Sequence, residues 1–225
     1  MKKITYLFFI ISFQVISQSG IITYNAKVDF EQTNPQAKAI SDEIKLMSFT
    51  LKYNNLISHF KKSKNIPLNN MMASYASVLI EAKNNWFQNA IKKESFYKKE
   101  IKSESYLVNH DSKMSDWVLT NKSKIIDGYT CYKAERKEFN SRSGKNILIT
   151  AWFSPDIPYP YGPIGNGGLP GLILQLKRHK RVTYTVNKII LNPKKITIPK
   201  IPKGEKVTIK EVIKKSRDAR KYTVD

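Results

Sequence analysis

The stretch that determines the architecture is Gly168-Leu169-Pro170-Gly171-Leu172-Ile173, where a loop rich in glycine and proline becomes an apolar run. Residues 172–176 are apolar enough to be covered on both faces, so we expect a buried strand there. Residues 181–190 alternate between apolar and polar positions and predict its antiparallel neighbour. Pro170 and Gly171 suit the two central positions of a type II turn that leads into the buried strand.

Segments typical of strands lie on both sides of this loop. The sequence predicts strands at 21–28, 48–53, 56–60, 95–101, 105–109 and 146–153, and one long strand, bent at Gly128, at 124–139. A hairpin centred on Ser143 joins the long strand to the segment that begins at Asn146. Apolar residues recur at helical spacing at 36–47, within 66–90 and at 207–220. We therefore expect an α+β fold, with a mainly antiparallel curved sheet and a few short helices in a single domain.

The first 19 residues have the pattern of a secretory signal peptide. Two lysines precede an apolar run over 4–16, and small residues suit a cut before Gly20. That run is too short to cross a bilayer as a helix, which takes about 20 residues. We expect residues 20–225 to be exported to the periplasm or the outer membrane. No cysteine lies near the cut, so we expect no lipoprotein anchor.

The chain is strongly basic, with 39 Lys and Arg against 18 Asp and Glu, and a formal net charge of +21. The excess is concentrated in residues 177–225, which contain 16 basic side chains and four acidic ones. Such a charge attracts polyanions. Behind a signal peptide these are anionic lipids and acidic glycans, and nucleic acid is not expected. Lysines that serve only as solvated surface are the alternative.

The C-terminal arm, residues 193–225, is interrupted by Pro193, Pro199 and Pro202 before its basic helix at 207–220. Two interpretations remain open for this helix. It is either a charged, flexible end of the chain, or a segment that lies on an anionic membrane leaflet as a peripheral contact.

Several motifs match one bacterial family. They are Ala151-Trp152-Phe153-Ser154-Pro155-Asp156-Ile157-Pro158, Tyr161-Gly162-Pro163-Ile164-Gly165-Asn166-Gly167 and the hexapeptide at 168–173, with Trp117 and residues 126–134 upstream. With these motifs the chain resembles the GLPGLI family of cell-envelope proteins from the Bacteroidetes, densely between residues 117 and 176. The family has no established reaction. The resemblance implies export and one β-rich domain, and it assigns no cofactor and no catalytic residue.

The glycine-rich loop is the first candidate site. It contains neither a dinucleotide-binding Gly-x-Gly-x-x-Gly nor a phosphate-binding Gly-Lys-Ser/Thr. We expect the family motif, Gly168, Leu169, Pro170, Gly171, Leu172 and Ile173, to be structural. Four aromatic residues either plug one end of the sheet or form the rim of a ligand groove, namely Trp152, Phe153, Tyr159 and Tyr161.

A second candidate is a run of cations that predicts a surface anion site or a solvated turn: Lys177, Arg178, His179, Lys180 and Arg181. The three histidines have no metal-ligand spacing, so we expect no metal and no cofactor. Cys131 is the one cysteine, and on a strand it is typically a small buried hydrophobe.

The first functional hypothesis is a non-enzymatic exported protein that binds an envelope component, which is an anionic lipid, a glycan or an outer-membrane protein. The second is an enzyme acting on an envelope polymer, with His110, Asp111, Asp127 and Asp156 as the first residues to test. The third is a structural accessory of an outer-membrane complex.

Overall fold

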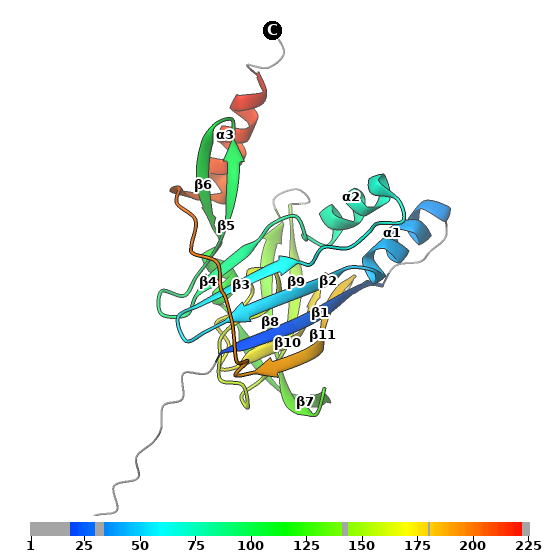
Figure 1. Cartoon of the computed structure of the whole chain (residues 1–225), viewed down its shortest axis with the longest axis vertical. Coiled ribbons are helices and arrows are strands. Elements are labelled where there is room, and N and C mark those ends of the chain that lie inside the picture. Colours follow the sequence, from blue (N-terminus) through cyan, green and yellow to red (C-terminus); the bar gives the residue numbers. More distant parts are fainter. Residues whose placement is uncertain (1–18, 30–33, 141–143, 180, 222–225) are drawn as a thin grey trace, which may run out of the picture.

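The computed structural model describes residues 19–29, 34–140, 144–179 and 181–221. Over these residues one sheet of twelve strands runs in the order β12-β6-β5-β4-β3-β2-β1-β11-β10-β9-β8-β7 (Figure 1). Its strands are β1 (Gly20–Val28), β2 (Ser48–Tyr53), β3 (Ile57–Lys62), β4 (Trp86–Asn89), β5 (Glu94–Ile101), β6 (Glu104–Asn109), β7 (Val118–Ile126), β8 (Tyr129–Asn140), β9 (Lys145–Ser154), β10 (Leu172–Arg178), β11 (Val182–Leu191) and β12 (Glu205–Thr208). The helices are α1 (Pro35–Lys45), α2 (Asn70–Leu79) and α3 (Ile209–Lys221), with 3-10 turns η1 (Asp111–Met114) and η2 (Pro163–Gly165).

The fold class expected from the sequence, α+β, is wrong. The protein is mostly β, because a single open sheet with edges at β12 and β7 dominates the described residues. The sheet is also mixed, since β12 pairs in parallel with β6 while the other neighbours pair antiparallel. The helices do not form a covering layer. In Figure 1, α1 and α2 lie together at one end of the central strands, and α3 lies with β5 and β6.

Much of the local pairing was predicted correctly. Strand β10 pairs antiparallel with β11, and β8 pairs with β9 from Tyr132↔Phe153 to Asn140↔Lys145. The second pairing confirms the predicted hairpin, although Ser143 itself lies outside the described residues. Helices α1 and α3 lie close to their predicted ranges. Only residues 70–79 of the ambiguous segment 66–90 form α2, and its end forms β4.

The predicted long strand at 124–139 is two strands. Asp127 and Gly128 both adopt positive φ, 50° and 80°, and form the turn between β7 and β8. Two consecutive residues with positive φ are the signature of the tight hairpin turn that Asp-Gly favours. The chain therefore reverses at Gly128 where the sequence analysis expected a bend.

The predicted type II turn at Pro170 and Gly171 is also wrong. That turn requires positive φ at its third residue, and Gly171 does not have it. The amide of Gly171 donates instead to the carbonyl of Leu169, and the amide of Leu172 donates to Ile157. Gly171 is required for a different reason, because a Cβ there would lie 2.1 Å from the carbonyl oxygen of Ser154.

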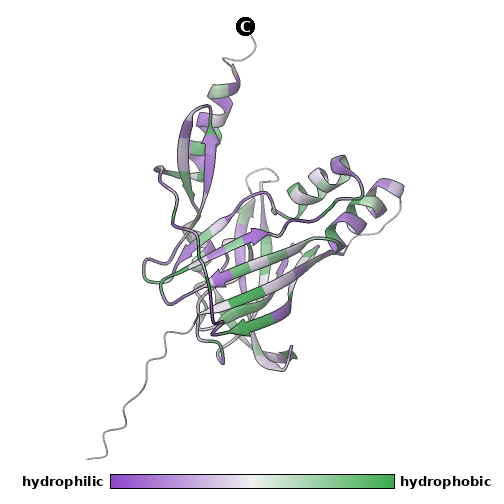
Figure 2. Cartoon of the chain, in the orientation of Figure 1, coloured by the Kyte–Doolittle hydropathy of each residue, from purple (hydrophilic) through white to green (hydrophobic). Residues whose placement is uncertain are grey.

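The main core lies against one face of the central strands and is rich in aromatic residues. Phe49 stacks on Phe60 at 5.7 Å, and Tyr184 meets both rings edge-on. Figure 2 shows the hydrophobic stretches that run along β1, β10 and β11. Cys131 belongs to this core, fully buried, as expected. Burial raises the pKa of its thiol to about 11.

The C-terminal arm crosses the sheet before it joins β6. It runs from the end of β11 past the central strands, as the orange trace in Figure 1 shows, and the Lys52 ammonium donates to the carbonyl of Thr197 at 3.2 Å. Val207 and Val212 then pack on Tyr106 and Val108 to form a second, small core. An open groove therefore lies between the arm and the sheet.

Candidate functional site

The glycine-rich loop is packed into the molecule through backbone contacts. Gly168 has φ +83°, and a Cβ there would lie 1.9 Å from the carbonyl oxygen of Met114. Its neighbour Gly167 donates to the carbonyl of Lys113 at 2.9 Å and accepts from the Trp117 indole at 2.8 Å. Leu169, Leu172 and Ile173 are buried in the main core. The loop is therefore fixed on both sides.

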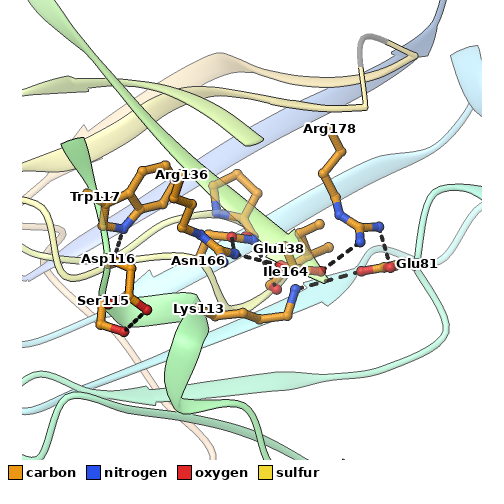
Figure 3. Close-up of polar contacts among 12 residues, drawn as sticks. Glu81, Lys113, Ser115, Asp116, Trp117, Arg136, Glu138, Ile164, Asn166 and Arg178 are labelled. Atoms are coloured by element: carbon orange, nitrogen blue, oxygen red, sulfur yellow. Dashed lines mark hydrogen bonds and ion pairs between the residues drawn. The ribbon is translucent and has the colours of Figure 1, made fainter. Parts of the chain in front are cut away.

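A cluster of buried and partly buried charges lies beside this loop (Figure 3). We call Glu81, Lys113, Arg136, Glu138 and Arg178 the ionic cluster. Glu138 accepts from Arg136 at 2.7 Å and from Arg178 at 2.9 Å, while Arg178 also donates to Glu81. Lys113 Nζ lies 3.7 Å from a Glu81 oxygen. Burial alone would raise the pKa of Glu138, but the three surrounding cations lower it to about 2.

Lys113 and His110 occupy the side of the ionic cluster that faces Trp86. The Lys113 ammonium lies 4.8 Å from the centre of the Trp86 ring and has no hydrogen-bond partner among the described residues. Burial lowers the pKa of Lys113, and the two glutamates oppose that effect. Burial, together with Lys113, also lowers the pKa of His110 to about 3. His110 is therefore neutral at physiological pH.

Asn166 joins the loop to the ionic cluster. Its side-chain oxygen accepts from Arg136 at 2.7 Å, its amide group donates to the carbonyl of Pro163, and its own carbonyl accepts from Gln88. Arg136 also lies over the Trp117 ring at 5.1 Å. Because each contact fixes a buried group, this assembly holds the loop, β4 and β8 in one arrangement.

An open groove of about 560 Å³ lies elsewhere, between the C-terminal arm and strands β3, β4 and β5. We call it the basic groove; its lining residues are His59, Lys61, Lys83, Asn84, Asn85, Phe87, Lys98, Glu100, Pro199, Lys200 and Pro202. Strands β3 to β5 supply one wall, and the proline-interrupted arm supplies the other.

The groove carries excess positive charge. Lys98 pairs with Glu100 at 2.7 Å. Within the described part of the chain, Lys61, Lys83 and Lys200 have no carboxylate at ion-pair distance. The rings of His59 and Phe87, which both line the groove, lie 4.7 Å apart. Burial, with the charges of Lys61 and Lys52, lowers the pKa of His59 to about 4.

The four aromatic residues predicted as a rim do not share one environment. Phe153 and Tyr161 are buried in the main core, whereas Trp152 and Tyr159 are half-buried. The Lys124 ammonium lies 4.4 Å from the centre of the Trp152 ring, and Tyr159 packs on Tyr53 at 4.8 Å. Trp152 and Tyr159 are the two members of the predicted rim that retain accessible surface.

The run of cations at 177–181 is divided between several environments. Lys177 pairs with Asp29 at 2.9 Å, and Arg178 belongs to the ionic cluster. His179 adopts φ +49° in the turn after β10, and Arg181 is exposed. Lys180 lies outside the described residues. The predicted anion site stays a prediction, with part of its charge neutralised by carboxylates.

Apart from the neighbours His110 and Asp111, the residues suspected of catalysis come from separate elements. His110 belongs to the buried region near Trp86, Asp127 to the exposed turn after β7, and Asp156 to the exposed turn after β9. The side chain of Asp111 lies outside the described part. Within the residues that the structure describes, no group of three or more His, Cys, Asp or Glu side chains is arranged to hold a metal ion.

Neither the basic groove nor the ionic cluster was predicted from the sequence. The groove is assembled from residues as distant as His59 and Lys200, and no local pattern connects them. For the cluster one signal existed, because Arg136 and Glu138 occupy alternate positions on the same face of β8 as the buried Ala134. Charges at buried positions of a strand indicate pairing within the fold.

Known proteins resemble this chain in a short stretch of sequence and in fold. Residues 135–175, which run from the second half of β8 through β9 and the glycine-rich loop into β10, match a family model described as a protein of unknown function (Porph_ging). Two solved structures of PNGF-II, in the C2 and P21 space groups, are similar to this chain with TM-scores of 0.59 at 12% and 13% identity.

Each PNGF-II match covers 91% of this chain and 34% of the PNGF-II chain, so the protein spans about a third of their length. At a sequence identity this low, the similarity shows a shared fold and nothing more. No curated protein matches the sequence. In the part of the chain that is described, no helix has the length and apolar character needed to cross a membrane.

Proposed function

We propose that this protein is an exported GLPGLI-type protein of the periplasm or outer membrane that binds an anionic envelope component without catalysis. The ligand class is a glycan or lipid headgroup that carries phosphate or carboxylate, and its site is the basic groove. One observation carries the proposal: three lysines without carboxylate partners line an open groove that two aromatic rings also line.

The chemistry of the groove suits such a ligand. Ammonium groups on flexible stems contact phosphate or carboxylate oxygens as point charges, and they tolerate ligands of different shape. His59 and Phe87 also line the groove, and the edges of their rings can contact a sugar ring or a glycerol backbone. Binding is preferred over catalysis because none of the suspected catalytic residues lines this groove.

The first experiment is native mass spectrometry of residues 20–225 produced in a Gram-negative periplasm. We expect extra mass that disappears on denaturation, and the identity of the released molecule separates lipid from glycan. A mass equal to that of the protein alone, combined with no binding in the titrations below, would exclude the proposed binding function.

The second experiment is calorimetric titration with two probes, a uronic-acid oligosaccharide and a soluble short-chain phosphatidylglycerol. We expect Lys61→Gln combined with Lys200→Gln to weaken binding of the true ligand class at least tenfold, because both groove walls lose a cation. Lys137→Gln combined with Lys188→Gln removes the same charge from exposed strand positions outside the groove and is the matched control. Equal weakening by both pairs would reduce the effect to overall charge and contradict a defined site.

A further inference from the structure

Helix α2 exposes an apolar face. Met71, Tyr75 and Val78 are 58%, 56% and 46% exposed, and Leu79 is 42% exposed. Just before the helix, Ile66 and Leu68 are also solvent-accessible, at 91% and 76%. We call these six residues the α2 face. Their spacing places the helical members on one side, because residues three and four apart are neighbours on a helix.

The side of α2 that faces the protein is apolar as well. Met72, Ala73 and Ala76 are buried, and Ala73 and Ala76 belong to the main core. Residues 65–80 carry no charged side chain, although a quarter of the chain is charged. A surface helix normally has a polar outer side, and a helix that is apolar all round is normally covered. The composition of α2 is therefore that of a helix with a partner on both sides.

The charges around the α2 face are basic. Lys38, Lys64 and Lys83 are exposed on the neighbouring segments. Of the nearby carboxylates, Glu43 is buried and accepts from the Asn69 amide, and Glu81 belongs to the ionic cluster. Asp42 pairs with Lys45 at 2.9 Å. The apolar face is thus flanked by lysines before and after it in sequence, with its nearby carboxylates already engaged.

We propose that the α2 face docks on an anionic lipid surface. The side chains of Leu68, Met71 and Val78 enter the boundary between headgroups and acyl chains, and Tyr75 lies at headgroup level. The lysines extend along the surface and contact the anionic headgroups. A second copy of this chain is a poorer occupant, because it would bring the same lysines against one another.

This proposal does not rest on the proposed function, because the α2 face and the basic groove share none of their defining residues. Lys83 lines the groove, so it is left unchanged in the variants below. The two sites are therefore separable: α2 variants should leave titration of the soluble probes unchanged, and groove variants should leave the apolar contact with vesicles in place.

The test is flotation of residues 20–225 with vesicles of phosphatidylcholine alone and of phosphatidylcholine mixed with phosphatidylglycerol. We expect binding to the anionic vesicles. The combined change Met71→Gln, Tyr75→Gln and Val78→Gln keeps helix-forming residues and should reduce the partition coefficient by about tenfold or more. Val118→Thr with Ile125→Thr removes exposed apolar side chains from β7 and should leave partitioning unchanged. The single change Tyr75→Gln should give a smaller reduction of the partition coefficient, and it serves as the test if the combined variant misfolds.

The electrostatic part of the proposal is tested by removing single lysines. Lys38→Gln and Lys64→Gln should each weaken partitioning roughly fivefold at low salt, more than Lys188→Gln on β11. Equal binding to neutral and anionic vesicles, no vesicle binding, or unchanged binding by the α2 variants would each overturn the proposal. The proposal would also be overturned if an α2 variant abolished dimerisation, or the binding of a stoichiometric protein partner, while flotation with vesicles stayed unchanged.

Discussion

At the scale of single residues, Glu138 shows how the protein keeps charges inside. Its carboxylate lies between two guanidinium groups, and its pKa of about 2 keeps it ionised at any physiological pH. Removing one member of a buried ion network leaves the other charges uncompensated, which costs far more than losing a surface pair. Glu138 therefore matters for stability more than for binding.

We predict that Glu138→Gln lowers the free energy of unfolding by about 3 kcal/mol at neutral pH. The matched control is Glu135→Gln on the same strand, whose partner Lys133 is nearer the surface and whose loss should cost less than about 1 kcal/mol. Urea denaturation of both variants measures the difference. Because the folded pKa is below the ordinary 4.5, the contribution of Glu138 is complete above that pH and lost as pH falls toward 2. Equal costs for the two variants would show that the ionic cluster adds nothing.

His110 predicts a second pH dependence. Its folded pKa is about 3, against an ordinary value of 6.5, so the unfolded chain takes up a proton between these values and the folded chain does not. Stability is therefore complete above about pH 6.5 and falls as pH drops toward 3. We expect His110→Asn to reduce the slope of unfolding free energy against pH by about 1 kcal/mol per unit between pH 6 and 4.5. An unchanged slope would mean that His110 is already charged in the fold.

At the scale of elements, the glycine-rich loop depends on close backbone contacts. Gly168 and Gly128 have nearly the same φ, +83° and +80°, but a Cβ at Gly168 would meet the backbone of Met114 whereas at Gly128 nothing lies within 4 Å. We predict that Gly128→Ala costs about 1 kcal/mol, from backbone conformation alone. Gly168→Ala should cost about 3 kcal/mol or more, because the clash adds to that strain. Thermal melting of the two variants separates the cost of backbone strain from the cost of the clash. A similar loss of stability in both variants would contradict the packing role of Gly168.

The elements also show where sequence reasoning succeeds and where it fails. Pairings such as β8 with β9 follow from local alternation and short turns, so they were predictable. The bend expected at Gly128 failed because Asp127 and Gly128 form a tight turn that reverses the chain. The fold class failed because local periodicity finds α1 and α2 but does not show that one continuous sheet dominates. The basic groove was beyond reach, since it requires the position of the arm across strands far away in sequence.

At the scale of the whole molecule, the C-terminal arm connects the edge of the sheet to the groove. It provides Pro199, Lys200 and Pro202 to one wall, then pairs β12 with β6 and covers Tyr106 and Val108. The main core uses none of these residues. The arm therefore completes the basic groove and protects the β6 edge, while the central strands have a core of their own.

We predict that a chain ending at Asn192 keeps the central strands folded but loses the groove. In hydrogen exchange, peptides from β6 should lose protection because the parallel partner and its apolar cover are gone, while peptides from β1 and β10 should keep theirs. Affinity for whichever of the two soluble probes binds the intact protein should fall further than with Lys200→Gln, because the truncation removes the whole groove wall that the arm supplies. Lys200→Gln itself, with the arm intact, should leave β6 protected and is the control. Loss of protection throughout the sheet would instead show that the arm belongs to a single cooperative folding unit.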